Sequence, residues 1–508
     1  MRKLAVVSRG LLALVFAWGL LPREGPAQGP STAPIDVAGD VTWAGPRVVD
    51  VEVRIRQGTL TIAPGSVVQF KAGGSIYVAP ECALVAVGRP GTPIRLTAEK
   101  TGQIGGQKCH MTFEHCVVRG MGVPDQHERA WWLSAGAGEK GIFVRRCEIT
   151  DSGGVTVAAS GPFEMVGCEL RKSRGGILVT GKGRALVAGN TIDGAGINMG
   201  PGDDRAVRGN VVIGGRIAGW HSRKLLVEGN YVHQPGPKGS YGLLRTAGTI
   251  RNNVIRGGSW VTSQIGGEIS SNVFLSLPHE EARKREGGFD RNCTHEHICG
   301  LQPKSRVVRN IFVGASYGAV MGIGDGTASD SVIRNNTFDM RGSGRAIYLN
   351  HLPKSDPKNV VVRNNIFIRS GTVVSEKPVH DTFSSVDYNL WSKSGLDRRR
   401  GRFWRVSMTG KNEGDVGFGG NDVPPYGKDG EQPAPEAVVV NPDVTFPFSD
   451  EDMLSRRHTV TEVLKHYRAA YALKPGSPAI DAGDPQDKDD LEVKDGKPDI
   501  GAVEADRK

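Results

Sequence analysis

The chain has 508 residues, of which 70 are glycine, and a formal net charge of +10 at pH 7. Glycine is about twice as frequent as the roughly 7% of average proteins, which favours a fold with many tight turns. Beyond the first thirty residues no segment is apolar enough to span a bilayer, so we expect no integral membrane segment once those residues are removed.

Residues 1–27 have the features of a secretory signal peptide. A basic start is followed by an apolar run from Leu11 to Leu21, and the small residues Gly25 and Ala27 offer a cleavage point. We therefore expect an exported protein, either secreted, periplasmic or held at the cell surface. A basic exported protein favours acidic polysaccharides as partners, with no nucleic acid, although a merely soluble surface explains the charge equally well.

Residues 31–110 are rich in predicted strands. The stretch from Gly58 to Val68 and the stretch from Val85 to Thr97 each carry apolar residues between glycine and proline breakers. Both stretches are typical of short strands joined by turns. We interpret them as the opening coils of the repeats that follow.

From residue 113 to residue 391 one small pattern occurs twelve times. An apolar residue is followed three positions later by Asn or Cys, and two positions after that by another apolar residue. The anchors of the pattern are Cys116, Cys147, Cys168, Asn190, Asn210, Asn230, Asn253, Asn272, Asn310, Asn336, Asn365 and Asn389. Most anchors lie just over twenty residues apart, which is one turn of a parallel β-solenoid.

The anchor residues suit a stack of coils. Stacked strands lie about 4.8 Å apart, so like residues come to lie directly above one another. Asn has two donors and an acceptor, which predicts a ladder of amide hydrogen bonds along the axis. The three Cys anchors predict a column of buried thiols. The last five repeats place Phe or Trp two residues after the anchor, which predicts an aromatic stack.

The run Arg251-Asn252-Asn253-Val254-Ile255, echoed at 334–338 and 363–367, resembles the right-handed parallel β-helix repeat of the pectate-lyase-like superfamily. The resemblance implies an all-β fold, a right-handed parallel β-helix (solenoid) with a short irregular C-terminal cap. That superfamily includes polysaccharide lyases, glycoside hydrolases, epimerases and non-catalytic surface proteins. The fold alone therefore does not choose an activity.

The longest insertion between anchors, at about 276–304, is the first place to expect chemistry. His and Glu can transfer protons, and cations can neutralise the carboxylate of a uronate substrate. The candidate catalytic residues are His295, Glu296, His297, Arg283 and Lys284.

Two cysteines, Cys293 and Cys299, enclose the His-Glu-His run of this insertion. A zinc site is one interpretation, but alternate strand residues lie about 6.6 Å apart and zinc needs ligands at about 2.1 to 2.3 Å. We predict a disulfide between the two cysteines, with free residues as the remaining alternative. Metal handling through this insertion stays a third functional option.

Four residues outside that insertion are candidates for substrate binding. Trp131 and Trp132 can stack on sugar rings, or pack their own loop onto the solenoid. Arg223 and Lys224 can bind an acidic polymer. They also stand one coil after the aspartate pair at 203–204, so neighbouring ion pairs are the structural alternative.

Residues 392–508 lack the repeat. We expect an irregular region with one helix, Thr461 to Leu473, and a closing segment (473–504) that caps the last coil. The closing segment resembles the C-terminal segment of many exported β-helix proteins. It also contains an acidic cluster that calcium would suit, with a solvated loop as the alternative; the candidate ligands are Asp481, Asp484, Asp487 and Asp489.

The chain thus divides into a signal peptide (1–27), opening coils (31–110), β-helix repeats (111–391) and a C-terminal region (392–508). We expect an exported carbohydrate-active protein, a lyase or an epimerase that acts on an acidic polysaccharide. The alternative is a non-catalytic surface or matrix scaffold that binds such a polymer. The sequence leaves open whether the chain is an enzyme, while favouring a polysaccharide lyase, and calcium is the one cofactor it suggests.

Overall fold

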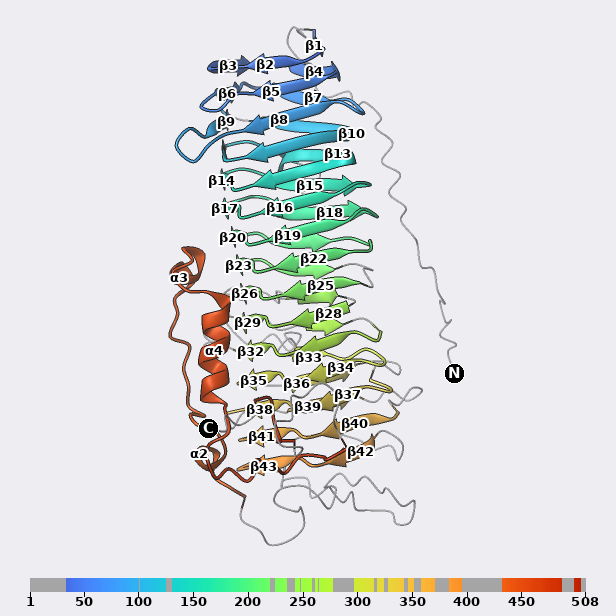
Figure 1. Cartoon of the computed structure of the whole chain (residues 1–508), viewed down its shortest axis with the longest axis vertical. Coiled ribbons are helices and arrows are strands. Elements are labelled where there is room, and N and C mark those ends of the chain that lie inside the picture. The colour runs from blue at the N-terminus through green and yellow to red at the C-terminus, as the bar shows by residue number, and fades with distance from the viewer. Residues whose placement is uncertain are drawn as a thin grey trace, which may run out of the picture.

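The computed structural model describes residues 33–503, with gaps at 100, 125–129, 220–223, 235–242, 247, 258–260, 264, 277–296, 315–317, 324–327, 342–345, 351–357, 371–382, 395–431 and 487–497. Short strands follow one another around an axis, and each strand pairs in parallel with the equivalent strand of the next coil. The result is one long stack of coils (Figure 1). The predicted fold class, an all-β parallel β-helix, is confirmed.

Each coil contributes strands to three faces of the stack. The first face contains β1 (Ile35–Ala38), β4 (Glu52–Gln57), β7 (Ser75–Val78), β15 (Gly154–Ala159), β18 (Ile177–Gly181), β21 (Ile197–Met199), β24 (Ile217–Gly219), β27 (Leu243–Thr246), β30 (Val261–Ser263), β33 (His297–Gly300), β36 (Gly318–Ile323) and β39 (Ile347–Asn350). The long strands β10 (Gln103–Glu114) and β13 (Ala130–Arg145) span the first and second faces. The short β12 (Val123–Pro124) pairs antiparallel with β13.

The second and third faces complete the coils. The second face contains β2 (Val41–Trp43), β5 (Thr59–Ile62), β8 (Ala83–Val87), β16 (Phe163–Val166), β19 (Ala185–Ala188), β22 (Arg205–Arg208), β25 (Leu225–Glu228), β28 (Gly248–Arg251), β31 (Glu268–Ser270), β34 (Arg306–Val308), β37 (Val332–Arg334), β40 (Val360–Arg363) and β42 (Phe383–Asp387).

The third face is a 15-stranded parallel sheet. It contains β3 (Pro46–Val49), β6 (Val67–Phe70), β9 (Ile94–Ala98), β11 (Cys116–Arg119), β14 (Glu148–Thr150), β17 (Glu169–Arg171), β20 (Thr191–Asp193), β23 (Val211–Ile213), β26 (Tyr231–Gln234), β29 (Val254–Gly257), β32 (Val273–Leu275), β35 (Ile311–Val313), β38 (Thr337–Asp339), β41 (Ile366–Ile368) and β43 (Leu390–Ser392).

The asparagine anchors form a continuous ladder at the corner between the second and third faces. From Asn190 to Asn389 each side-chain amide donates to the Oδ1 of the next anchor at 2.9 to 3.1 Å. The same Oδ1 accepts the backbone N–H of the previous anchor. The residue before each anchor adopts positive φ, which glycine allows freely and Asn tolerates, as Gly209 (60°) and Asn252 (55°) illustrate.

Two further columns continue along the axis. The rings of Phe274, Phe312, Phe338, Phe367 and Trp391 stack with centroids 4.7 to 5.2 Å apart, so the predicted aromatic stack is confirmed. The three cysteine anchors are buried free thiols. The backbone N–H of Cys168 donates to Asn190 Oδ1 at 2.8 Å, which joins the cysteine column to the asparagine ladder.

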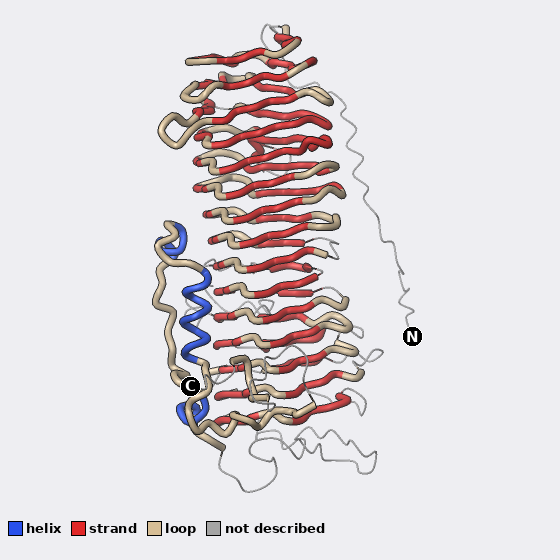
Figure 2. The backbone as a smooth tube through the Cα atoms, viewed as in Figure 1, coloured by secondary structure: helices blue, strands red, loops and turns tan. Residues whose placement is uncertain are grey.

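The C-terminal region lies along the outside of the coils. It contains α2 (Pro435–Val438), α3 (Asp450–Leu454) and α4 (Val460–Ala470), the last of which is the predicted helix. We call residues 432–486 and 498–503 the strap. The strap runs back along the third face as far as β20 and β23, where α3 lies (Figures 1 and 2). The closing segment lies beside the C-terminal coils, where the backbone of Gly501 donates to Asn364 O and that of Ala502 donates to Thr337 Oγ1, and its capping role stays a prediction.

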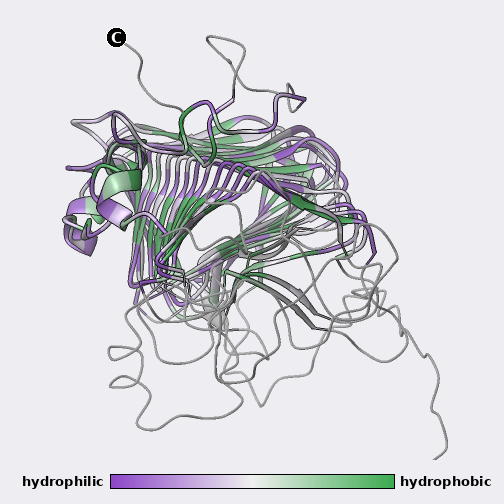
Figure 3. Cartoon of the chain, turned by 90° about the horizontal axis from the view of Figure 1, so that it is seen from below, coloured by the Kyte–Doolittle hydropathy of each residue, from purple (hydrophilic) through white to green (hydrophobic). Residues whose placement is uncertain are grey.

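A second hydrophobic core explains this position. Outward residues of the third face, such as Val211, Val273 and Ile366, are buried against strap residues such as Val463 and Tyr471. Viewed along the axis, α4 lies outside the superposed coils (Figure 3). In the sequence, the third-face strands covered by the strap are marked by three consecutive apolar residues. A strand that is buried on both sides loses the usual alternation of apolar and polar residues. In the described part of the chain no helix is long and apolar enough to cross a membrane.

The ladder predicts a specific sensitivity to substitution. Replacing Asn253 by Ala removes the acceptor of the Asn230 amide and the donors to Val227 O and Asn272 Oδ1. Buried groups that lose their partners cost about 1 to 3 kcal/mol each, so we expect destabilisation of about 3 kcal/mol. Chemical denaturation measures it, with Asn198→Ala on the outward side of β21 as control. Equal midpoints for the two variants would contradict a stabilising ladder.

Candidate functional site

Most of the predicted catalytic insertion lies outside the described residues. This holds for Arg283, Lys284, Cys293, His295 and Glu296. His297 begins β33, where its backbone pairs with Gly318 of β36. The insertion therefore joins a third-face strand, β32, to a first-face strand, β33. Its proposed role stays a prediction.

The disulfide prediction is wrong. Cys299 is a free thiol, fully buried on the inward side of β33. Burial raises the pKa of this thiol well above its usual value, which is the environment of an unreactive structural cysteine. Cys299 lies in the core between Val261 of β30 and Val320 of β36, both of which are fully buried.

The two tryptophans have different surroundings. Trp132 is fully buried, and its ring meets Phe113 edge to face at 5.2 Å. It presents no surface to a sugar, so the prediction that Trp132 binds substrate is wrong. A register irregularity in β13 between Trp131 and Leu133 turns both Trp132 and Leu133 inward. Trp131 is half-buried and pairs with Gly154 of β15.

The acidic C-terminal cluster is engaged in holding the strap. Asp484 is 3% exposed, and its carboxylate accepts from Arg363 Nη1 at 2.6 Å and from the backbone of Gln486. The backbone N–H of Asp481 donates to Asp499. The other two predicted calcium ligands, Asp487 and Asp489, lie outside the described residues. Among the residues that are described, no group of three or more His, Cys, Asp or Glu side chains is placed to hold a metal ion.

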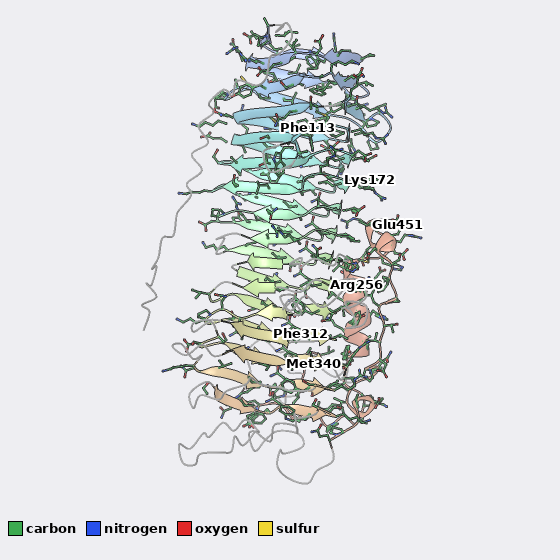
Figure 4. The ribbon with its side chains drawn as sticks, turned by 180° about the vertical axis from the view of Figure 1, so that it is seen from behind. Phe113, Lys172, Arg256, Phe312, Met340 and Glu451 are labelled. Carbon is green, nitrogen blue, oxygen red and sulfur yellow. The ribbon has the colours of Figure 1, made fainter. Side chains whose placement is uncertain are left out.

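A His–Asp pair lies under the strap. His233 Nδ1 is 2.8 and 2.9 Å from the two carboxylate oxygens of Asp450, and Arg256 Nη1 is 3.6 Å from the first of them. Arg256 also lies 4.3 Å from the ring centroid of Phe446, at the junction of coils and strap (Figure 4). Burial acts to raise the pKa of Asp450, but the hydrogen bond and charge of His233 and the charge of Arg256 outweigh it, so the pKa is lowered.

This pair is structural rather than catalytic. The second ring nitrogen of His233, Nε2, is buried and finds no hydrogen-bond partner in the described structure. It therefore cannot exchange a proton with a bound substrate. The pair instead fastens α3 to β26, in the same way that Arg456 and Arg468 of the strap donate to Gly209 O and Ser271 O.

The first face is different from the other two. Its outward residues follow one column, in which Ser134 pairs with Thr156, then Leu178, Asn198 and Ala218. Trp131 precedes this column at its upper end. At about 4.8 Å per coil, about 14 Å separate the Trp131 and Asn198 coils. The described part of the face thus offers an aromatic ring, hydroxyls, one leucine and an amide, and the column is covered at Ala218, which is fully buried.

Exposed cations line the corner between the first and second faces. We call them the basic row: Lys108, Lys140, Lys182, Arg184, Lys224, Lys304 and Lys358. None of them forms an ion pair with another described residue. Exposed carboxylates of Asp40, Glu81, Glu139, Asp203, Asp204 and Asp330 share the corner, so its seven described cations exceed its six described carboxylates by one. Lys224, which we predicted to bind an acidic polymer, is part of the basic row, whereas Arg223 lies outside the described residues.

Several arginines on the second and third faces are instead paired along the stack, although no described residue forms an ion pair with Arg47 or Arg95 of the third face. Arg145 bonds Glu164 of the next coil at 2.6 Å, and Arg119 bonds Glu148 at 3.2 Å. Glu228 lies between Arg208 and Arg251 at 3.4 and 2.7 Å. Such in-register pairs neutralise each other across neighbouring strands. The cations of the basic row differ from these arginines, because none of them has an ion-pair partner among the described residues.

The fold defines the chain as a parallel β-helix protein, and comparisons with known proteins add little to that. No protein-family model matches the chain, and no curated protein matches it. Among solved structures, a crystal structure of pectate lyase Pel9A aligns with 87% of this chain and 88% of that chain, at 12% sequence identity and a TM-score of 0.25. Similarity at this level carries no argument, and the fold assignment rests on the strand pairing described above.

The lowered pKa of Asp450 predicts how the strap responds to acid. A carboxyl group with a depressed folded-state pKa stabilises the fold above its unfolded value, about 3.9, and that contribution is lost as the pH falls through the folded value. We expect the denaturation midpoint to fall less between pH 5 and pH 2.5 in Asp450→Asn than in the unmodified chain. Asp36→Asn, which removes a surface ion pair with Arg56, serves as control. Parallel curves for Asp450→Asn and the unmodified chain would contradict this role.

Proposed function

We propose that the protein is exported and binds an acidic polysaccharide along its first face. The supporting observation is the basic row, whose seven exposed cations have no ion-pair partner among the described residues and border a face that presents Trp131, Ser134, Thr156, Leu178 and Asn198. The third face is unavailable over much of its length because the strap covers it. Export rests on the signal-like residues 1–27.

A linear polyanion suits this arrangement. Equivalent corners of successive coils repeat every 4.8 Å or so, so the cations form a line parallel to the axis rather than a compact patch. A polymer with one carboxylate per sugar meets several such cations at once. Trp131, half-buried at one end of the same face, supplies a ring on which a sugar can stack.

Cleavage of the polymer, if it occurs, is assigned to the insertion between β32 and β33. In an elimination a base removes the proton from the carbon next to the uronate carboxylate, and the glycosidic oxygen leaves to give an unsaturated sugar. We propose His295, Glu296 and His297 for the proton transfers, and Arg283 or Lys284 for neutralising the carboxylate. The insertion enters the first face at β33, on the proposed binding surface.

A non-catalytic scaffold is the second candidate. Several described groups with shifted pKa values, such as Asp450, Tyr231 and Tyr471, are held between the third face and the strap. Perturbed titratable groups tend to mark catalytic centres. On the first face the shifted groups are Cys299, a thiol buried in the core, and Arg54, which is paired with Glu52, and neither is placed as an acid or base for a bound polymer. A protein that only binds the polymer accounts for this distribution as well.

Neutralising two cations of the basic row tests the binding proposal. We expect Lys182→Gln with Arg184→Gln to weaken binding of polygalacturonate or alginate about tenfold, or about 1.4 kcal/mol, and to reduce its salt dependence. The matched control is Arg119→Gln with Arg145→Gln, which removes the same charge from ion-paired positions on the other faces. Equal losses in both double variants would mean that net charge alone drives binding.

Activity is tested separately on the same polymers, with and without calcium. If the chain is a lyase, absorbance from unsaturated uronate appears and is lost in His295→Ala or His297→Ala, while polymer binding persists. New reducing ends without that absorbance would indicate hydrolysis. Binding without either product supports the scaffold, and absence of both binding and products would reject an acidic-polysaccharide function.

A further inference from the structure

The N-terminal end of the solenoid is formed by three strands with one open edge each. β1 pairs only with β4, β2 only with β5 and β3 only with β6, so the opposite edges meet no described strand. These strands form one extremity of the stack (Figure 1). An unpaired row of backbone N–H and C=O groups is a ready template for another strand.

Apolar side chains accompany the open edge. Ile35 of β1 is 54% exposed and Val48 of β3 is 60% exposed, among the few large apolar residues of the described chain that solvent reaches. Val41 and Trp43 of β2 pack against the core but are only partly covered. Terminal coils of a solenoid need a polar outer surface to stay apart, and here Ile35 and Val48 are exposed between the charged residues Asp36, Arg47 and Asp50.

The C-terminal end of the stack, in contrast, is contacted by the strap. In the last coil Ser392 Oγ donates to Pro433 O at 2.8 Å, and the backbone of Ser394 donates to the Gln432 side chain at 2.8 Å. The strap therefore contacts the last coil, whereas nothing described covers the first. The short segment that signal cleavage would leave ahead of β1 contains Pro30 and Pro34 and no large apolar residue, which suits it poorly to pair along these edges.

We propose that two copies of the chain associate end to end through this surface. A two-fold axis perpendicular to the solenoid axis brings an edge strand against its own copy in antiparallel orientation, which extends the sheet across the contact. β3 is followed by Asp50 and contains Arg47, both exposed and without an ion pair among the described residues. Antiparallel approach brings the Arg47 end of one strand toward the Asp50 end of the other. This association is independent of the proposed polysaccharide binding.

Sedimentation and small-angle X-ray scattering of the mature chain test the proposal. We expect a concentration-dependent dimer about twice as long as the monomer. Val48→Lys or Ile35→Lys should raise the dimer dissociation constant at least about tenfold, since a lysine places charge on the contact. Val440→Lys is the matched control, because Val440 is similarly exposed (55%) but lies in the strap. Circular dichroism establishes that each variant folds.

Three outcomes would overturn the proposal. A wild-type chain that stays monomeric at tens of micromolar has no such contact. A dimer that survives Val48→Lys and Ile35→Lys but not Val440→Lys uses the strap instead. A monomer that dimerises only after residues 28–34 are deleted would show that the chain's own segment covers the end. Charge reversal adds a positive check, since Arg47→Glu should weaken the dimer and added Asp50→Lys should restore it.

Discussion

Stacking of one coil on the next is the constraint from which the rest of the structure follows. No coil has enough residues to bury its own apolar face, so each depends on its neighbours for a core. The asparagine ladder fixes the register of that stacking, because each Oδ1 accepts both the amide and the backbone N–H of the previous anchor. A slip by one residue would break every rung and turn the core outward.

Because the register is fixed, equivalent residues of successive coils form columns along the axis, and each column has its own environment. Inward columns form the core and its aromatic stack. Some outward residues on the second face and on the N-terminal part of the third form ion pairs between coils, while the apolar outward column that begins near Val211 is covered by the strap. The first face is left with mostly polar outward residues, one leucine among them, and a border of cations that have no described ion-pair partners. Function is therefore proposed where the fold leaves charge uncompensated.

The sequence predicts what periodicity controls, and misses what depends on local irregularity. Anchors, aromatic stack and α4 follow from spacing alone. The sequence did not show that Trp132 is buried, because a register irregularity in β13 turns this residue inward. It did not show that Cys299 is buried, because Cys299 occupies an inward position of β33 rather than the insertion before that strand. The strap's position along the third face was readable in principle, since Ile311–Val313 and Ile366–Ile368 are apolar at every position. The unpaired cations of the basic row could not be found without knowing which arginines have partners.

Hydrogen–deuterium exchange of the protein with and without an acidic polysaccharide is the most direct test of the binding account. The account predicts new protection in β18, β21 and the 182–184 corner, with little change in strands such as β14 and β17 on the third face. Protection confined to the third face or to the strap would contradict it. So would an unchanged exchange pattern at polymer concentrations that saturate binding.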